Sequence, residues 1–169
     1  MQRGFVYIEI LWGVVGVSAL LLRGLFCLFP YVSELSSYAL DQWHGVALAG
    51  SLLFLGYAEG YKGFQLKFSP RAAARLAVIW RDPTCARVLL APLFCMGFFD
   101  ATPKRKRIAY GLTLMVIALI LLVEQLPQPW RGIVDAGVLL GLGWGLCSFW
   151  MASIRVFSGA MVPVDPELS

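Results

Sequence analysis

The sequence predicts an all-α, polytopic membrane protein, a helical bundle with four transmembrane helices. The chain has 169 residues, of which 59% are hydrophobic and 14% are charged, and its mean hydropathy is +0.74. A soluble domain usually carries about 25% charged residues. The apolar residues form four long stretches, and 10 of the 14 basic residues fall in a single connection between two of them. This composition excludes a disordered tail, a disulfide-stapled secreted module and an ordinary soluble enzyme.

Four stretches match the length of a membrane crossing, because a hydrocarbon core of about 30 Å needs about 20 mostly apolar residues. The first covers residues 5–29 and is closed by Pro30. No small-residue cleavage site follows its apolar run, so we expect a retained span and not a removed signal peptide. We expect one integral membrane domain over residues 1–169. Its remaining spans cover residues 43–61, 108–126 and 133–154.

The connection between the second and third stretches, residues 62–107, indicates the orientation. The connections on the opposite side contain one basic residue, Arg131, and three acidic ones. Because Lys and Arg collect in cytoplasmic loops, we expect residues 62–107 and both termini in the cytoplasm. The size of the chain, with no recognisable organelle signal, favours a bacterial inner membrane. The basic residues of the connection are Lys62, Lys67, Arg71, Arg75, Arg81, Arg87, Lys104, Arg105, Lys106 and Arg107.

Two segments of this connection are expected to form short elements. Residues 71–81 carry arginines on one helical face and apolar residues on the other. This pattern is typical of a helix lying in the membrane interface, or of a cytoplasmic helix packed on the underside of the bundle. Residues 88–99 are apolar, interrupted by Pro92 and too short for an ordinary span. We expect a re-entrant or interfacial hairpin there, since a fifth crossing would carry residues 104–107 to the outside.

Anionic lipid is the expected partner of the basic connection. Each Lys or Arg near a negatively charged leaflet contributes about 1 kcal/mol of attraction. Since the topology already accounts for these charges, we expect no nucleic-acid partner. The expected headgroup contacts are Arg71, Arg75, Arg81, Lys104, Arg105, Lys106 and Arg107.

Ionisable residues inside the apolar stretches are candidate sites, because each costs about 2.5–3.5 kcal/mol on insertion scales. Glu9 and Arg23 enclose only thirteen residues, so at least one of them is expected within the apolar slab. Arg23 and Asp135 fall at comparable depth in the outer half of the membrane, and we expect them to pair. The alternative is that Arg23 extends outward along its stem and Asp135 reaches headgroup water.

The densest polar and aromatic cluster covers residues 57–65, at the inner end of the second stretch. Glu59, Tyr61 and Gln65 are candidates to frame a pocket for a headgroup or a cation. The alternative is an ordinary interfacial helix end with Gly63 as its C-cap, because Tyr and Lys are common at that depth.

His44, the single histidine, is expected at the outer mouth, hydrogen-bonded to the region of Asp41. A role as a lone metal ligand or proton acceptor stays open. The four cysteines have no CxxC spacing and are expected to be core hydrophobes, so we expect no metal site and no cofactor. The sequence contains no GxSxG, HExxH, Walker A or GxGxxG motif, and we assign no catalytic residue.

Small residues recur every four positions in the last stretch and again in the second, as Gly137, Gly141, Gly145, Gly56 and Gly60. This spacing lets helix backbones approach closely in lipid, where no hydrophobic effect drives association. We expect contacts within one chain from these glycines in preference to a dimer face. Residues 108–126 contain few small residues, so much of their surface is expected to face lipid.

These features favour a small accessory protein, that is, a subunit, assembly factor or adaptor, which packs against another membrane protein and engages anionic lipid. The alternative is a small oligomeric transporter or channel whose polar path is lined by Glu9, Arg23, Glu59 and Asp135. A membrane enzyme acting on lipid is the third and least favoured role. Composition does not separate the three roles, and it leaves open whether the partner is another membrane protein or a second copy.

Overall fold

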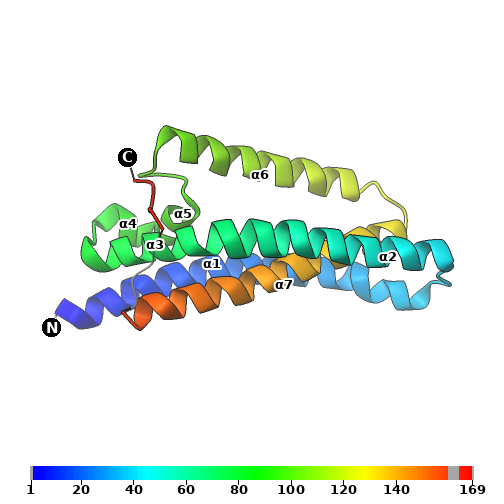
Figure 1. Ribbon diagram of the computed structural model, residues 1–169, viewed down its shortest axis with the longest axis horizontal. Helices are drawn as coiled ribbons and strands as arrows, with labels where there is room; N and C mark the ends of the chain where they lie inside the picture. Colours follow the sequence, from blue (N-terminus) through cyan, green and yellow to red (C-terminus); the bar gives the residue numbers. More distant parts are fainter. Residues whose placement is uncertain (1, 160–163, 169) are drawn as a thin grey trace.

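The computed structural model describes residues 2–159 and 164–168, with side chains from residue 10 onward. No strand occurs among these residues. Figure 1 shows four long antiparallel rods: α1, the rod formed by α2, η2 and α3, then α6 and α7. The elements are α1 (Gln2–Ser33), the 3-10 helix η1 (Glu34–Ser37), α2 (Gln42–Leu55), the π-helix η2 (Gly56–Phe68), α3 (Ser69–Arg81), α4 (Cys85–Leu89), α5 (Ala91–Met96), α6 (Pro103–Val123) and α7 (Trp130–Phe157).

Three helical segments are long and apolar enough to cross a membrane: Ile10–Ser37 in α1 and η1, then α6 and α7. Apolar helices of this length indicate an integral membrane protein. The second predicted stretch falls in α2, which has 14 residues, and in η2. α1 continues through Pro30 to Ser33, so the predicted helix end at Pro30 is wrong by one turn. The ring of a proline removes one N–H donor, but its fixed φ near −65° still suits a helix.

The rod of α2, η2 and α3 does not end at residue 61, and the predicted C-cap at Gly63 is wrong. In η2 the backbone widens to π-type hydrogen bonding, and the N–H of Ser69 donates to the carbonyl of Phe64, five residues earlier. Gly56 and Gly60 lie on the side of η2 that faces α7, where an added Cβ would come within 3.1 Å of Leu140 or Trp144. The wider helix therefore keeps its small residues on this interface past the point where the local sequence signals an end.

The glycine series on α7 lies against the same rod, which confirms the prediction of contacts within one chain. A Cβ on Gly137 would lie 2.7 Å from the carbonyl oxygen of Ser51. A Cβ on Gly145 would lie 2.5 Å from the ring of Phe64. The backbones approach each other this closely because glycine has no side chain at the crossing.

α3 packs inward against α1, α5 and α7. Its alanines and Leu76 join Ile10, Phe94 and Phe149 in a buried core. α4 and α5 have five and six residues and are each too short to cross a membrane. They form a hairpin that turns at Leu90, and α5 ends at Gly97, whose φ is +87°; in Figure 1 both helices lie at the end that carries the N-terminus.

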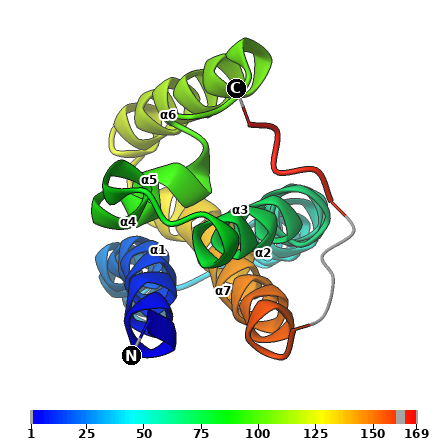
Figure 2. The same ribbon diagram turned by 90° about the vertical axis from the view of Figure 1, so that its left-hand side faces the viewer.

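α6 stands apart from the other long helices, as Figures 1 and 2 show. Only 6% of its apolar window is buried, against 50% for α7. Every side of the helix is exposed from residue 111 to residue 122. In Figure 2 its first turn lies near α5 and the C-terminal segment, so its start is held while the rest extends freely.

Candidate functional site

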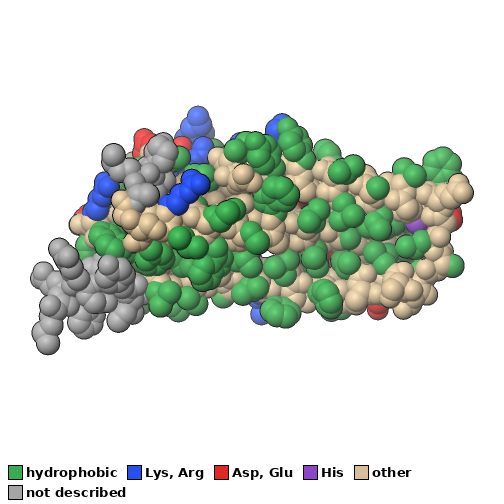
Figure 3. Space-filling model, turned by 60° about the horizontal axis from the view of Figure 1, so that its bottom comes forward, with side chains coloured by type: hydrophobic (Ala, Val, Ile, Leu, Met, Phe, Trp, Pro, Cys, Tyr) green, Lys and Arg blue, Asp and Glu red, His purple; other side chains and the backbone are tan. Residues whose placement is uncertain are grey.

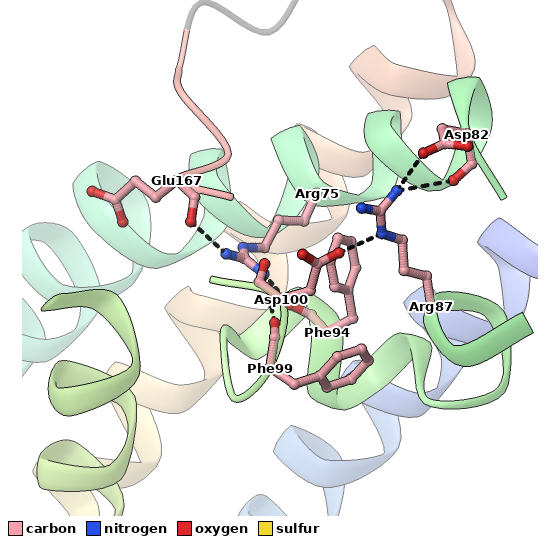
Figure 4. A network of polar contacts seen from close by, with 7 residues as sticks. All are labelled: Arg75, Asp82, Arg87, Phe94, Phe99, Asp100 and Glu167. Atoms are coloured by element: carbon pink, nitrogen blue, oxygen red, sulfur yellow. Dashed lines mark hydrogen bonds and ion pairs between the residues drawn. The ribbon is translucent and has the colours of Figure 1, made fainter. Parts of the chain in front are cut away.

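The largest polar network lies at the end of the bundle that holds α3, α4, α5 and the start of α6 (Figure 4). Figure 3 shows that Lys and Arg side chains gather toward this end on the face drawn, whereas hydrophobic side chains cover its middle. The network joins segments far apart in the sequence, and its members are four arginines, three acidic residues and several backbone carbonyls.

Arg75 of α3 is the buried centre of this network, with 1% of its surface exposed. Its Nη1 donates to the carbonyl oxygens of Phe94 at 3.0 Å, Asp100 at 3.3 Å and Phe99 at 3.4 Å. Its Nη2 donates to the carbonyl oxygen of Glu167 at 3.1 Å. Burial lowers the pKa of the guanidinium, because a charged group loses its water there. Arg75 thus supplies donors to carbonyls of the loop after α5 and of the C-terminal segment.

Arg87 of α4 joins the loop after α5 to the end of α3. Its Nε donates to Asp100 at 2.5 Å and its Nη1 donates to Asp82 at 2.7 Å. The hydrogen bond that Arg87 donates to Asp100 raises the pKa of Arg87. Two carboxylates around one guanidinium make this part of the network locally acidic, and it fixes the hairpin to the end of α3.

The C-terminal segment, residues 164–168, reaches this network through Glu167 (Figure 4). The carbonyl oxygen of Glu167 accepts hydrogen bonds from Arg75 and from the N–H of Thr102 at 3.0 Å. Its N–H donates to a carboxylate oxygen of Asp165. Its φ of +52° is uncommon for a residue with a side chain, so its neighbours must hold it in this conformation.

The carboxylate of Glu167 lies between Arg71 of α3 and Arg105 of α6. One of its oxygens is 3.9 Å from Nε of Arg71 and 3.8 Å from Nε of Arg105, beyond hydrogen-bonding distance. Arg105 is 8% exposed, and its Nε is buried without a hydrogen-bond partner. A buried donor left in this state costs about 1–3 kcal/mol. The three arginines around Glu167 therefore form a cationic site that one carboxylate fills poorly.

Two of the predicted headgroup contacts, Arg75 and Arg105, are buried in this network, and the prediction for them is corrected. The end of α5 and the C-terminal segment cover both: Arg75 donates to Phe94 and Glu167, and Arg105 lies against Gly97 and Glu167. Arg71 is 32% exposed at its side chain. The remaining predicted contacts are exposed or partly exposed: Arg81, Lys104, Lys106 and Arg107.

The predicted pair of Arg23 and Asp135 does not form. Asp135 is 3% exposed and its carboxylate lies 3.6 Å from Nε of Arg131, one turn earlier on α7. Arg23 is exposed on α1. Asp135 pairs with Arg131 because both lie on α7 at the i, i+4 spacing, which brings their side chains together. The side chain of Glu9 lies outside the described residues.

Glu59, Tyr61 and Gln65 do not gather around one pocket. Glu59 faces α7, where its Cβ lies 3.1 Å from the point that a Cβ on Gly141 would occupy. Tyr61 stacks on Tyr57 at 5.8 Å between ring centroids, and both are exposed. The Oε1 of Gln65 accepts a hydrogen bond of 2.7 Å from the indole of Trp144. The interpretation as an interfacial helix end is wrong as well, since the rod continues into α3.

His44 has the expected partner, Asp41, and this prediction is confirmed. The N–H of His44 donates to Asp41 at 2.9 Å, and the N–H of Asp41 donates to Nδ1 of His44, so the two form a capping box at the start of α2. The backbone hydrogen bond from His44 lowers the pKa of Asp41. Within residues 2–159 and 164–168, no group of three or more His, Cys, Asp or Glu side chains is placed to hold a metal ion.

The sequence analysis missed the acidic half of the network, namely Asp82, Asp100 and Glu167. Each follows a proline or stands near a turn, and none lies on a periodic helix face. One signal was available in the sequence. Arg75 stands alone among alanines and a leucine in α3, and a helix on the surface does not need apolar residues on so many sides of an arginine.

Comparisons of the chain with protein-family models, with curated proteins and with solved structures gave no match. Its function has therefore to be inferred from the residues and contacts described above.

Proposed function

We propose that this protein is an integral membrane accessory protein that uses α6 to pack against another membrane protein, in a bacterial inner membrane. In this proposal the chain is a single domain that crosses the bilayer four times, with the rod of α2 and η2 as the fourth crossing beside α1, α6 and α7. Residues 62–107 and both termini lie on the cytoplasmic side.

The antiparallel order of the rods supports this topology. In Figure 1 the N-terminus, the hairpin of α4 and α5, the start of α6 and the C-terminus lie at one end of the molecule. Most of the basic residues belong to this end, because residues 62–107 hold 10 of the 14. An even number of crossings with a basic cytoplasmic end satisfies the positive-inside rule.

The observation that carries the accessory role is the exposure of α6. A membrane helix gains little from the hydrophobic effect inside lipid, so it associates through close van der Waals packing. α6 makes almost none of this packing with its own chain: Leu114, Ile117 and Leu121 are 68%, 49% and 56% exposed. These three side chains, spaced i, i+3 and i+7, share one face of the helix, and the positions between residues 111 and 122 are exposed on its other sides as well, so a partner helix has a complete apolar surface to pack against.

Anionic lipid is the second partner in the proposal. The exposed basic residues at the cytoplasmic end attract negatively charged headgroups at about 1 kcal/mol each. After the correction for the two buried arginines, the proposed contacts are Arg71, Arg81, Lys104, Lys106 and Arg107.

Photo-crosslinking in living cells tests the α6 partner. A photoreactive amino acid is introduced at Leu114, Ile117 or Leu121, and at Phe26 and Leu53 as controls with 76% and 75% exposure on α1 and α2. We expect one discrete adduct with another protein from α6 and none from the controls. Equal adducts from the controls, or lipid adducts alone from α6, contradict the proposal. An adduct of two copies of this chain supports the oligomeric alternative instead.

A transporter or channel is the second candidate, favoured by polar groups on α7 and along its interface with the rod of α2 and η2. Asp135 is buried on α7, the hydroxyl of Ser51 is buried without a hydrogen-bond partner opposite Gly137, and Glu59 lies opposite Gly141. Arg23 lies on the exposed side of α1 and belongs to no such line. The proposed path therefore uses Glu59 and Asp135 without Arg23.

Reconstitution in liposomes tests this candidate with protons and K⁺ as probes. Transport through the interface predicts a flux above that of protein-free liposomes, reduced at least tenfold by Glu59→Gln and unchanged by Arg23→Gln. A flux equal to that of protein-free liposomes, or equal loss in both variants, contradicts it.

A further inference from the structure

The cationic site around Glu167 is larger than its occupant. Arg71, Arg75 and Arg105 converge on one residue, and the ion pairs of Arg71 and Arg105 both go to the same carboxylate oxygen at 3.9 and 3.8 Å. Arg75 reaches only the carbonyl oxygen of that residue. The buried Nε of Arg105, 3.8 Å from that oxygen, has no hydrogen-bond partner. An anion with more oxygens and more charge than a carboxylate would satisfy these donors better.

A phosphate group has this chemistry. The planar fork of a guanidinium binds phosphate oxygens with two parallel hydrogen bonds, and these charge-assisted bonds are among the strongest in proteins. A phosphate monoester or inorganic phosphate carries close to two negative charges near neutral pH. Two or three arginines around a dianion balance its charge, whereas Glu167 supplies one negative charge.

We propose that Arg71 and Arg105 form a binding site for a phosphate dianion, that Arg75 holds the backbone of Glu167 beside it, and that the side chain of Glu167 occupies this site as a tethered competitor. The ligand is a phosphate monoester on a lipid headgroup or free phosphate, which share the chemistry that the arginines recognise. The inference rests on the proposed function only in placing this end of the protein at the cytoplasmic membrane surface.

The geometry allows the exchange without unfolding. The side chains of Glu167 and Arg71 are 35% and 32% exposed, so an anion can reach the site from solvent. The backbone of Glu167 is held separately, by hydrogen bonds to Arg75 and to the N–H of Thr102. The carboxylate can therefore rotate outward while the carbonyl continues to satisfy Arg75.

Titration calorimetry on the purified full-length protein in neutral detergent tests the site. The probes are inorganic phosphate and short-chain phosphatidic acid, at constant ionic strength, with chloride and short-chain phosphatidylcholine as negative controls. Glu167→Gln removes the competing carboxylate from the site. The phosphate probe no longer has to displace it, so binding is expected to tighten roughly threefold to tenfold. Arg71→Gln is expected to weaken binding at least tenfold. Arg155→Gln, at an exposed arginine on α7 that belongs neither to this site nor to the proposed lipid contacts, is expected to leave it unchanged.

The outcomes are distinct. Saturable binding of inorganic phosphate with these variant effects supports the site and a free phosphate as its ligand. Binding of phosphatidic acid alone, with the same effects, supports the site and a lipid headgroup. The proposal is overturned when neither probe binds the wild type or Glu167→Gln, when Glu167→Gln fails to tighten binding, or when Arg155→Gln weakens it as much as Arg71→Gln. Because no partner protein is present and α6 is intact, these results are independent of the crosslinking test.

Discussion

Arg75 shows how one charged residue can organise the end of a helical bundle. A guanidinium offers five donors, and Arg75 uses them on carbonyls of the α5 loop and of the C-terminal segment. Two of these carbonyls also accept a backbone N–H, that of Phe94 from Gly97 and that of Glu167 from Thr102, whereas Phe99 and Asp100 lie in the irregular segment after α5. A ring contact with Phe94 at 4.9 Å adds a cation–π interaction. The residue thus replaces the hydrogen bonds that irregular backbone would otherwise lack when buried.

Arg75→Met is expected to lower the free energy of unfolding by about 3 kcal/mol or more, because several buried carbonyls lose charged donors worth about 1.5–3 kcal/mol each. Thermal or denaturant unfolding in detergent measures the change. Arg81→Met, an exposed control on the same helix, is expected to stay within about 0.5 kcal/mol of wild type. An equal effect of the two substitutions would show that Arg75 does not stabilise the hairpin.

Cys95 and Cys85 are expected to differ in reactivity toward maleimide. Burial raises the pKa of the Cys95 thiol to about 12 from 9.0, which lowers its thiolate population at pH 8 roughly a thousandfold. Cys85 is exposed at the start of α4. Mass spectrometry of the folded protein in detergent is expected to find Cys85 modified and Cys95 unmodified, and Cys95 modified only after denaturation. Between about pH 9 and 12 the unfolded chain loses this proton first, so stability falls as pH rises.

At the scale of elements, the interface of α7 with the rod of α2 and η2 depends on glycine. The π-helix η2 places Gly56 and Gly60 against α7. On the α7 side, Gly137, Gly141 and Gly145 lie against the rod of α2 and η2 at successive turns. Hydrogen bonds across this interface are few; the indole of Trp144 to Gln65 is the one that joins the two rods in this region of the described chain. Close backbone approach, more than polar pairing, therefore joins the two rods.

Gly137→Ala is expected to destabilise the protein by about 1–3 kcal/mol, because its methyl group would meet the backbone oxygen of Ser51 at 2.7 Å. Gly143 is the matched control on the same helix, since nothing lies within 4 Å of a Cβ there. Gly143→Ala is expected to be neutral or to stabilise by up to about 1 kcal/mol through helix propensity. Thermal unfolding in detergent measures both, and a larger loss in Gly143→Ala would contradict the packing described.

At the scale of the whole molecule, the distribution of charge and the arrangement of the helices support the same orientation in the membrane. The long rods run antiparallel, and the end with most of the basic residues is also the end with the short helices and the C-terminal segment (Figure 1). The opposite end holds the connection of residues 34–41 and that of residues 124–129. With its basic end in the cytoplasm, the protein satisfies the positive-inside rule, and no run of basic residues lies at the outer face of the bilayer.

The orientation predicts which engineered cysteines react from outside. Lys104→Cys, at the basic end, is expected to stay unlabelled by a membrane-impermeant maleimide in intact cells. Gln125→Cys, in the opposite connection, is expected to be labelled above the wild-type background. Both positions are exposed, so access and not burial decides the result. Labelling of Lys104→Cys before lysis would reverse the proposed topology.

Much of the fold could be predicted from sequence, and much less of the site. The apolar length of α1, α6 and α7, the hairpin interrupted by Pro92 and the glycine interface follow from patterns along the chain. The predicted end of the second rod at residue 61 is wrong. η2 continues to Phe68 because it packs against α7, and this contact cannot be read from the residues of η2 alone. The partner of Asp135 was predicted wrongly because a cation one helical turn away competes with one on another helix.

The sequence by itself determined the helical class, the apolar stretches and the concentration of positive charge at one end, because these depend on composition and local period. Only the tertiary structure decided which arginines face inward. Arg75 receives its hydrogen-bond partners from residues 19 to 92 positions away, and a helix face that α5 and the C-terminal segment cover has the same residue spacing as one that lipid covers. Burial is a property of the neighbours, and the neighbours of these arginines are brought together by the fold.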